Sequence, residues 1–333
     1  MRFAGQNEDA AAGGRWRGLV AVVAAIGLVV LSGCATQRGR RAPVSYTTAS
    51  WSYGRAQGRK ISTAHYDIYT TLRDEVLLGA LPGFVEAAYE NYQQLLPSTR
   101  QVDERMKVYL FATRGQWERF TRRFTGSRSK LFLKVRNGGY SERGVSVIEY
   151  VAHQITFPLF AHEGFHQYVY HYVNSQIPSW LNEGLAVTCE GQRWGMHGLK
   201  AFEAEYNPRR RNDVTAALVS NRLHSLRRLL ETHPGEVIEG SNRSVVTYYA
   251  QVWSLILFLR EGADGKYATA FERLLSQLDE VDIAQYARAA HIWSDRKRFS
   301  FGEALFRSFI SEDLDTVERE YFEFMRERFL GRG

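Results

Sequence analysis

Apolar and polar positions alternate in three short stretches of the first half of the chain. These stretches are rich in β-branched and aromatic residues and predict strands at residues 65–72, 106–112 and 145–150. Between the first two, apolar residues recur every three or four positions over residues 82–96, which predicts a helix. Thr113 can cap a second helix that carries Trp117. The first half therefore combines a small sheet with helices.

The second half of the chain shows helical spacing almost throughout. The strongest stretch is residues 247–260, where Tyr248, Val252 and Leu255 fall on one face. Further helical stretches cover residues 199–206, 212–220, 225–231, 266–278, 284–291, 301–309 and 313–329. The pattern predicts an α+β fold, with a small N-terminal mixed sheet and a helical C-terminal part.

A continuous apolar run, residues 19–31, follows a polar segment that ends in arginines. The run is shorter than the about 20 residues of a membrane-spanning helix, but it has the length of a signal-peptide core. It leads into Leu-Ser-Gly-Cys34, which resembles a bacterial lipobox, where the cysteine is lipidated and becomes the mature N-terminus. We therefore expect a lipoprotein signal peptide at residues 1–33. An uncleaved anchor helix is the alternative.

Lipidation of Cys34 would anchor the chain to a membrane of the bacterial cell envelope, outside the cytoplasm. Ala35 is not the aspartate that retains lipoproteins in the inner membrane, which favours the outer membrane. Residues 34–60 show little periodicity and many Gly, Ser, Thr and Arg residues, so we expect a flexible tether. The folded domain then covers residues 61–333, with a sheet-containing half at 61–175 and a helical half at 176–333.

Composition and charge place the domain among ordinary globular proteins. The chain is 44% hydrophobic and carries a net charge of 43 minus 36, or +7, part of it in a predicted loop at residues 209–211. No nucleic-acid-binding motif is evident, so we expect no nucleic-acid partner. The two cysteines are not expected to pair, because Cys34 belongs to the targeting segment and Cys189 has the pattern of a small core residue.

The candidate chemistry lies in residues 157–190. His162 to His166 form an H-E-x-x-H pattern in a stretch that predicts a helix, with Pro158 in its first turn. Residues four apart share a helix face, so His162 and His166 can offer two imidazoles to one Zn²⁺ ion. Glu163 lies one residue round the helix, where it can act as general base on water at the metal.

A catalytic zinc site needs a third protein ligand and an open position. Residues 178–186 have the sequence PSWLNEGLA and place Glu183 at the start of a second predicted helix. Together, H-E-x-x-H-Q and the following W-L-N-E-G-x-A resemble the gluzincins, the thermolysin-like and aminopeptidase-like zinc peptidases. The segment also resembles uncharacterised bacterial envelope proteins with a peptidase-like domain. The matching residues are His162, Glu163, His166 and Gln167, followed by Trp180 to Ala186.

The resemblance implies a thermolysin-like catalytic domain around the H-E-x-x-H helix. His162, His166 and Glu183 would hold Zn²⁺, and Glu163 would be the general base. The substrate would be a peptide or protein, which in this family can lie along an edge strand of the sheet. Residues 145–150 are the candidate edge strand. The expected function is therefore that of a membrane-anchored, zinc-dependent peptidase.

The sequence departs from the family pattern at two points. No G-x-M-x-N segment precedes the helix, and this aminopeptidase motif holds the free amino end of a substrate. Its absence favours endopeptidase activity. Thermolysin-like enzymes also carry an acidic residue four positions after the third ligand, but that position here is Val187. Glu190 lies a turn later, so the groups that orient the metal ligands stay open.

Hydrolysis of an amide also needs a donor for the developing oxyanion. The family uses a Tyr or His from the helical half, and Tyr249, in the segment Y-A-Q-x-W, is our candidate. The alternative is that Tyr248 and Tyr249 both pack in the core. Weaker candidates are His197, His224 and His233.

A different class of function stays open beside hydrolysis. The same fold, with or without zinc, could bind peptides or cell-envelope polymers without cleaving them. The presence of every residue type that the reaction needs favours the enzyme. The sequence does not define the substrate or the oligomeric state.

Overall fold

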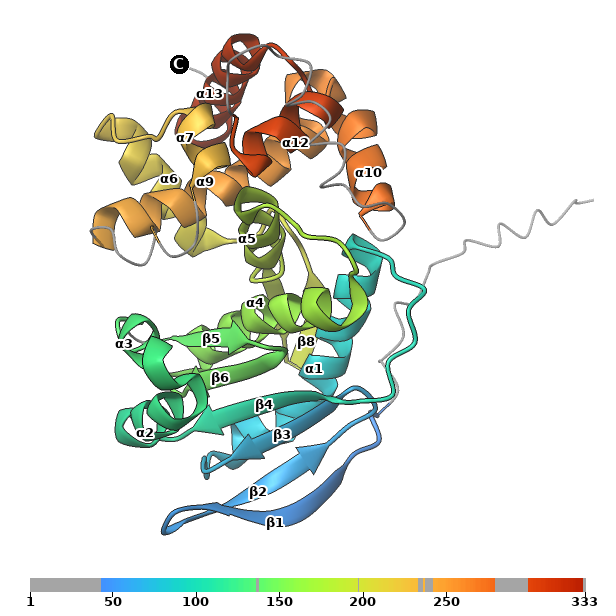
Figure 1. Ribbon diagram of the computed structural model, residues 1–333, viewed down its shortest axis with the longest axis vertical. Helices are drawn as coiled ribbons and strands as arrows, with labels where there is room; N and C mark the ends of the chain where they lie inside the picture. Colours follow the sequence, from blue (N-terminus) through green and yellow to red (C-terminus); the bar gives the residue numbers. More distant parts are fainter. Residues whose placement is uncertain are drawn as a thin grey trace, which may run out of the picture. The chain divides into compact units, whose positions relative to one another are not determined.

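The computed structural model describes residues 43–135, 138–196, 198–232, 236, 242–278 and 299–331. Within these residues a six-stranded sheet packs against helices, which gives a mixed α+β fold as predicted (Figure 1). The prediction of strands at residues 65–72, 106–112 and 145–150 is confirmed by β3, β4 and β6. The sheet consists of β1 (Thr47–Tyr53), β2 (Ala56–Ser62), β3 (Tyr66–Thr70), β4 (Met106–Phe111), β5 (Gly139–Glu142) and β6 (Val145–Glu149).

The first two strands correct the prediction of a flexible tether over residues 34–60. β1 and β2 form an antiparallel hairpin that pairs Thr47 with Ser62 and Tyr53 with Ala56. The connection contains Gly54 at φ +60°, a conformation that glycine adopts without strain and that tight hairpin turns require. The many Gly, Ser and Arg residues give this stretch the composition of a tether. In the folded chain β2 pairs with β3, and Trp51 and Tyr53 of β1 pack against the core around Phe111.

The strand order also corrects the predicted substrate-binding edge. The order is β1-β2-β3-β4-β6-β5, with β3, β4 and β6 parallel and the other neighbours antiparallel. β6 therefore lies inside the sheet, and the four-residue β5 takes the edge beside it. The turn between β5 and β6 places Arg143 and Gly144 at positive φ, which closes a hairpin too short to stand out in the sequence.

Helices cover both faces of the sheet. α1 (Glu75–Leu95) and α4 (His153–Tyr172) form a large core with one face, through residues such as Ile68, Val108 and Ile148. α2 (Arg114–Thr125), the short 3-10 turn η1 (Gly126–Arg128) and α3 (Ser129–Phe132) lie against the other face, where Trp117 and Phe132 are buried. Thr113 caps α2 by accepting a hydrogen bond from the Gln116 N–H, as predicted.

The helix predicted at residues 82–96 begins seven residues earlier, at Glu75. The Asp74 carboxylate caps it by accepting the Leu77 N–H at 3.1 Å. The same carboxylate accepts the Tyr150 hydroxyl at 3.1 Å and contacts His153 Nε2 at 2.6 Å. Asp74 thereby connects the start of α1 with the start of α4, which carries the metal-site histidines. These bonds, with that to His153 first, lower the pKa of Asp74 to about 2.

We expect Asp74→Ala to lower the free energy of unfolding by about 1–2 kcal/mol at pH 7, the range found for lost helix caps. The folded-state pKa lies below the unfolded value, so this contribution is complete above about pH 4 and is lost as the pH falls through 2. Urea unfolding at pH 7 and at pH 2.5 measures both effects. The exposed Asp103 provides a matched control, and an equal loss in Asp103→Ala would contradict the prediction.

The rest of the chain is mainly helical (Figure 1). The helices predicted at residues 212–220, 225–231, 247–260, 266–278, 301–309 and 313–329 are confirmed, whereas residues 284–291 lie outside the described part. The elements are α5 (Ser179–Thr188), α6 (Pro208–Val219), α7 (Leu226–Glu231), α9 (Asn242–Glu261), η2 (Ala263–Gly265), α10 (Ala268–Gln277), α12 (Phe301–Phe309) and α13 (Leu314–Leu330). α9 packs against α5, and α6, α10 and α13 pack against α9. Within the described part of the chain, no helix combines the length and the apolar character that crossing a membrane requires.

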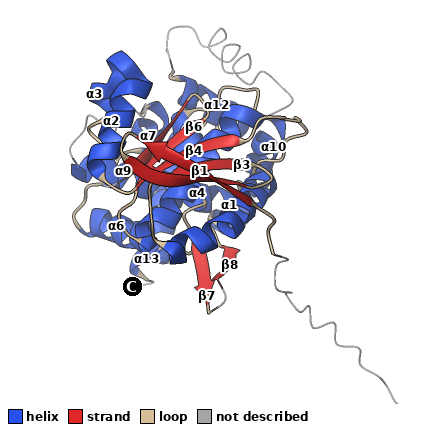
Figure 2. Ribbon diagram, turned by 90° about the horizontal axis from the view of Figure 1, so that it is seen from below, coloured by secondary structure: helices blue, strands red, loops and turns tan. Residues whose placement is uncertain are grey.

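The helical stretch predicted at residues 199–206 is wrong. β7 (Gln192–Gly195) and β8 (Gly198–Phe202) form an antiparallel hairpin there, which extends from the helices in Figure 2. The ring of Trp194 packs against Phe84 and Phe157, with centroids 5.9 and 4.6 Å apart. This packing against α1 and α4 favours the strand, a tertiary effect that the local spacing does not contain.

Candidate metal site

α4 carries the two histidines and is fixed to the sheet by its own side chains. The Gln167 side-chain amide donates to the carbonyls of Lys107 and Gly144 at 2.8 and 2.9 Å, which joins the helix to the starts of β4 and β6. Pro158 lies in the second turn and not in the first, because the helix begins at His153. The prediction of a helix here is confirmed, and its first turn is corrected.

Gly164, in the middle of the H-E-x-x-H pattern, is explained by its neighbour Tyr92. A side chain at this position would place its Cβ 2.5 Å from the Tyr92 hydroxyl. That hydroxyl donates to the Ala161 carbonyl at 2.8 Å, one turn before. The buried Tyr92 side chain from α1 therefore leaves no room for a side chain at this position of α4.

α5 presents the residues of the Trp-Leu-Asn-Glu-Gly segment to partners on two sides. Trp180 is fully buried and donates its indole N–H to the Gly302 carbonyl at 3.2 Å. Asn182 and Glu183 face α4. A Cβ on Gly184 would lie 2.7 Å from Ile256, so glycine permits the close approach of α9. The segment thus fixes the helix on one side and directs the Glu183 carboxylate to the histidines on the other.

The structure brings together the three predicted metal ligands. His162 Nε2 and His166 Nε2 lie 3.3 Å apart. Glu183 Oε2 lies 3.4 Å from the first nitrogen and 3.5 Å from the second. His162 and Glu183 are buried, and His166 is largely so. A search of the described residues for groups able to hold a metal ion finds this one.

The hydrogen bonds around these atoms show why a cation fits. His162 Nδ1 lies 3.0 Å from a Glu190 oxygen, and His166 Nδ1 lies 3.2 Å from Asn182 Oδ1. The two contacting oxygens accept hydrogen bonds, so in a neutral imidazole at either position Nδ1 carries the proton and Nε2 presents a lone pair. The buried Glu183 Oε2 has no hydrogen-bond partner of its own. Three electron-pair donors therefore converge, an arrangement that a metal ion would satisfy.

The electrostatics of the site also stabilise positive charge. Burial would raise the pKa of Glu183, but His166 and His162 outweigh it and lower the pKa. Burial would lower the pKa of His162, but Glu183 and Glu190 outweigh it and raise the pKa. The pKa of Glu163 is raised, chiefly by burial. A carboxylate with a raised pKa accepts and returns a proton more readily near neutral pH.

No protein-family model and no curated protein matches this chain. The geometry of the site is therefore the main ground for a function.

The sequence did not assign the group that orients His162, and the structure identifies it as Glu190. α5 ends at Thr188, and the chain then turns so that the Glu190 carboxylate faces His162. Arg210 holds that carboxylate with two bonds, of 3.1 and 2.7 Å, and Asn207 donates to it at 3.1 Å. Burial would raise the pKa of Glu190, but the charge of Arg210 and the hydrogen bond and charge of His162 outweigh it and lower the pKa.

Arg210 corrects the prediction that residues 209–211 form a charged loop. Its side chain is only 9% exposed, lies on α6 and contributes to the site instead of to the surface charge. Its guanidinium also lies 5.3 Å from the centre of the Tyr249 ring. The sequence contains one indication of the group that orients His162, namely the acidic Glu190 about one turn after the position expected for the family. It contains no indication that Arg210 would contact Glu190.

Removal of the Glu190 carboxylate should weaken metal binding. We expect Glu190→Ala to raise the Kd for Zn²⁺ about 10–100-fold, the effect of losing a group that orients a metal-bound histidine. Glu190→Gln keeps an acceptor for His162 and should show a smaller loss. Chelator competition measures both, with far-UV circular dichroism to confirm folding. The exposed Glu205 is the control, and equal affinities in Glu190→Ala and Glu205→Ala would refute the role.

The ring of Tyr249, the predicted oxyanion donor, lies beside His162. The centres of its ring and the His162 ring are 5.9 Å apart. Burial raises its pKa well above the usual value, with Glu183 adding to the effect, so its hydroxyl is a neutral donor at neutral pH. The neighbouring Tyr248 is 2% exposed, and its hydroxyl has no hydrogen-bond partner among the described residues.

The remaining candidates contribute less. His224 is held by Gln251, whose side chain bonds both its backbone N–H and its carbonyl. Cys189 is a buried free thiol, as expected for a core residue. His197, His233 and Cys34 lie outside the described residues.

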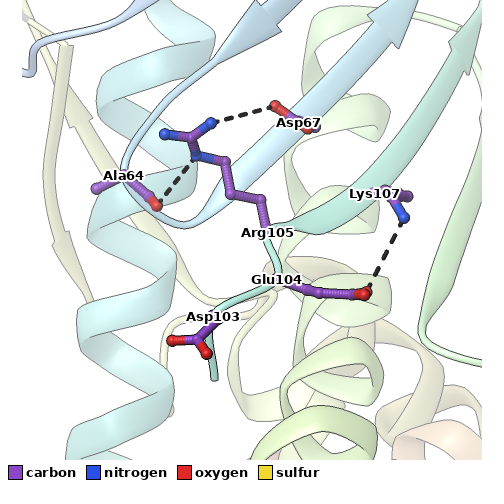
Figure 3. Close-up of a pocket in the computed structure, with 6 residues that line it drawn as sticks. All are labelled: Ala64, Asp67, Asp103, Glu104, Arg105 and Lys107. Atoms are coloured by element: carbon purple, nitrogen blue, oxygen red, sulfur yellow. Dashed lines mark hydrogen bonds and ion pairs between the residues drawn. The ribbon is translucent and has the colours of Figure 1, made fainter. Parts of the chain in front are cut away.

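A separate polar depression of about 460 Å³ lies where β3 and β4 begin (Figure 3). Four of its charged side chains pair with one another, Arg105 with Asp67 at 3.9 Å and Lys107 with Glu104 at 4.0 Å, and the exposed Asp103 also lines it. Because these charges are already compensated at an open surface, the depression contributes nothing to a functional assignment.

Proposed function

We propose that the chain is a zinc-dependent peptidase of gluzincin type, and that zinc is the metal held by His162, His166 and Glu183. The observation that carries this proposal is the spacing of the three donor atoms, 3.3, 3.4 and 3.5 Å. Ligands at about 2.0–2.2 Å from a tetrahedral zinc lie about 3.3–3.6 Å apart. Neighbouring ligands of an octahedral ion with the same bond lengths lie only about 2.8–3.1 Å apart.

The donor types support the same metal. Two imidazoles and one carboxylate are the ligands of many catalytic zinc sites, in which a fourth position stays free for water or substrate. Each imidazole is oriented through its Nδ1–H, one by Glu190 and one by Asn182. The resemblance to gluzincins rests on the same residues, and it supports the thermolysin-like identity of the domain.

The proposed chemistry assigns a role to each of these side chains. Zinc bound there supplies a Lewis acid for the scissile carbonyl and lowers the pKa of water. Glu163 accepts a proton from the attacking water as its oxygen bonds to the carbonyl carbon. Glu163 then delivers the proton to the amide nitrogen as the carbon–nitrogen bond breaks.

Tyr249 is our candidate for the donor to the oxyanion. We expect Tyr249→Phe to lower kcat about 10²-fold or more, the usual cost of removing one such donor. The Kd for Zn²⁺ should stay within a few-fold of the parent value, because the hydroxyl is not a ligand. Tyr248→Phe is the matched control, and steady-state kinetics compares the two. A larger loss in Tyr248→Phe would transfer the role to that residue.

We further propose that the peptidase acts in the bacterial cell envelope, anchored through lipidated Cys34. The lipobox-like sequence and the preceding apolar run support this placement, and Ala35 favours the outer membrane. The substrate would be a peptide or protein cleaved within its chain, because the amine-binding motif of the aminopeptidases is absent.

Hydrolysis of a peptide library by the purified chain tests the proposed function. We expect internal cleavages that stop when zinc is removed by a chelator and return when about one equivalent of zinc is added. Mass spectrometry of the products would locate the bonds. A chain that binds zinc tightly and cleaves none of the peptides would contradict the peptidase proposal and support a binding function.

A further inference from the structure

The face of the sheet opposite α4 carries an aromatic surface that the proposed peptidase chemistry does not use. Strand register places Trp51 and Tyr53 of β1, Tyr69 of β3 and Tyr109 of β4 on this face. All four are half-buried. α2 and α3 cover the same face only in part, through the second core around Phe111. The aromatic side chains therefore keep part of their surface open to solvent.

Small residues on β2 allow these rings to meet across the strand between them. Trp51 is paired with Gly58, and Tyr53 with Ala56. A Cβ on Gly58 would lie 2.1 Å from the Thr70 carbonyl oxygen, so no larger residue fits there. The Trp51 ring consequently reaches over β2 to Tyr69, with centroids 5.6 Å apart.

The rings form the floor and wall of a groove of about 470 Å³. Trp51 and Tyr53 lie at 17° to each other, and Tyr69 and Tyr109 at 16°. Tyr69 and Tyr109 are stacked with centroids 5.0 Å apart, and Phe120 lies 4.3 Å from Tyr109, so the half-buried Trp51 of the edge strand β1 is the ring with the better access for a ligand. The groove is lined by Trp51, Tyr53 and Tyr109 from the sheet and by Phe120, Phe124 and Arg123 from α2.

The polar groups at the groove suit an acidic ligand. Arg119 and Arg123 are exposed, lie close enough to Tyr53 to lower its pKa against the effect of burial, and have no acidic partner among the described residues. Their neighbour Arg122, in contrast, pairs with Glu118 at 3.2 Å. The Tyr53 hydroxyl is buried and has no hydrogen-bond partner in the described structure. Two free guanidinium groups thus lie beside the aromatic rings.

We propose that this aromatic groove binds an acidic polysaccharide. The faces of aromatic rings carry partial negative charge and attract the C–H groups on the flat side of a sugar ring. Guanidinium groups bind carboxylates through two parallel hydrogen bonds. A sugar ring would stack on Trp51, while Arg119 and Arg123 hold the carboxylates.

Two other occupants fit less well. A lipid bilayer needs aromatic side chains that protrude into the headgroup region, whereas these are half-buried in a groove. Single-stranded nucleic acid carries a phosphate at every nucleotide and needs a continuous basic track. Here Lys60, over the Tyr69 ring, is already paired with Asp67 at 2.8 Å, which leaves the two arginines.

Isothermal titration of the full chain with hexagalacturonate tests the proposal. We expect saturable binding that weakens at least about tenfold in Trp51→Ala, since loss of ring contacts of about 1.4 kcal/mol corresponds to that factor. Arg123→Ala changes an exposed residue and should weaken binding of the acid to a similar extent. Binding of the methyl-esterified, uncharged hexamer should be the same in Arg123→Ala and in the parent chain. Arg122→Ala is the matched control and should bind like the parent.

Several outcomes would overturn the proposal. One is the absence of hexagalacturonate binding at millimolar concentration, and another is equal affinity in Arg123→Ala and Arg122→Ala. Tighter binding of a dodecamer of thymidylate or of phosphatidylglycerol vesicles, with the same dependence on Trp51 and Arg123, would assign the groove to those ligands instead. The affinity for zinc should be unchanged in every variant, which separates this groove from the peptidase proposal.

Discussion

Glu163→Gln should lower kcat for peptide hydrolysis by about 10³–10⁴-fold, the upper range for a group that transfers protons in both directions. The amide cannot accept the proton from water or return it to the leaving nitrogen. Its size matches the carboxylate, so the helix and the ligands should keep their positions. Because Glu163 is not among the three converging donors, the Kd for Zn²⁺ should stay within a few-fold of the parent value.

Measurement of kcat and of zinc content on the same preparations separates catalysis from metal binding. Glu205→Gln, an exposed change in the same half of the chain, serves as the control and should leave both unchanged. Hydrolysis that persists in Glu163→Gln would contradict the assignment of Glu163 as general base. A loss of zinc together with activity would instead make Glu163 part of the metal site.

Glu183→Ala should raise the Kd for Zn²⁺ by about 10²–10³-fold. Structural zinc sites with four ligands bind with about 10–16 kcal/mol, so one ligand contributes roughly 3–4 kcal/mol, and 1.4 kcal/mol corresponds to a factor of ten. The loss of affinity for Zn²⁺ should be larger than in Glu190→Ala, because that change removes only a group that orients a ligand. Chelator competition in a common buffer compares the two variants directly.

The folded state of Glu183→Ala has to be verified, because the carboxylate is buried beside two imidazoles. Circular dichroism and thermal unfolding of the metal-free proteins serve this purpose. Glu183→Gln keeps the volume of the side chain and should lose most of the affinity too. Parent-like affinity in both variants would show that Glu183 is not a ligand.

The three converging donors of the candidate metal site could be predicted from the sequence because each lies in a local pattern. His162 and His166 share a helix face through their four-residue spacing, and Glu183 follows in a segment whose Trp180 and Gly184 fix α5 in the core. Helical periodicity also identified most of the C-terminal helices, since each buries an apolar face of its own.

The features that the sequence did not predict depend on contacts between distant segments. Glu190 faces His162 because α5 ends at Thr188 and the chain then turns. Arg210, which lies on α6, donates a hydrogen bond to the Glu190 carboxylate. The β1–β2 hairpin pairs with β3 and packs against the core around Phe111, and its Gly and Arg residues are typical of a tether. β6 lies inside the sheet because the short β5 pairs with its outer side. Spacing along one segment does not contain such information.

The zinc content of the parent chain tests the central claim most directly. The chain would be stripped with a chelator, given a small excess of Zn²⁺, separated from free metal and analysed by elemental mass spectrometry against protein concentration. Our account predicts about one zinc per chain, held by His162, His166 and Glu183. A folded chain that retains no zinc under these conditions would contradict it.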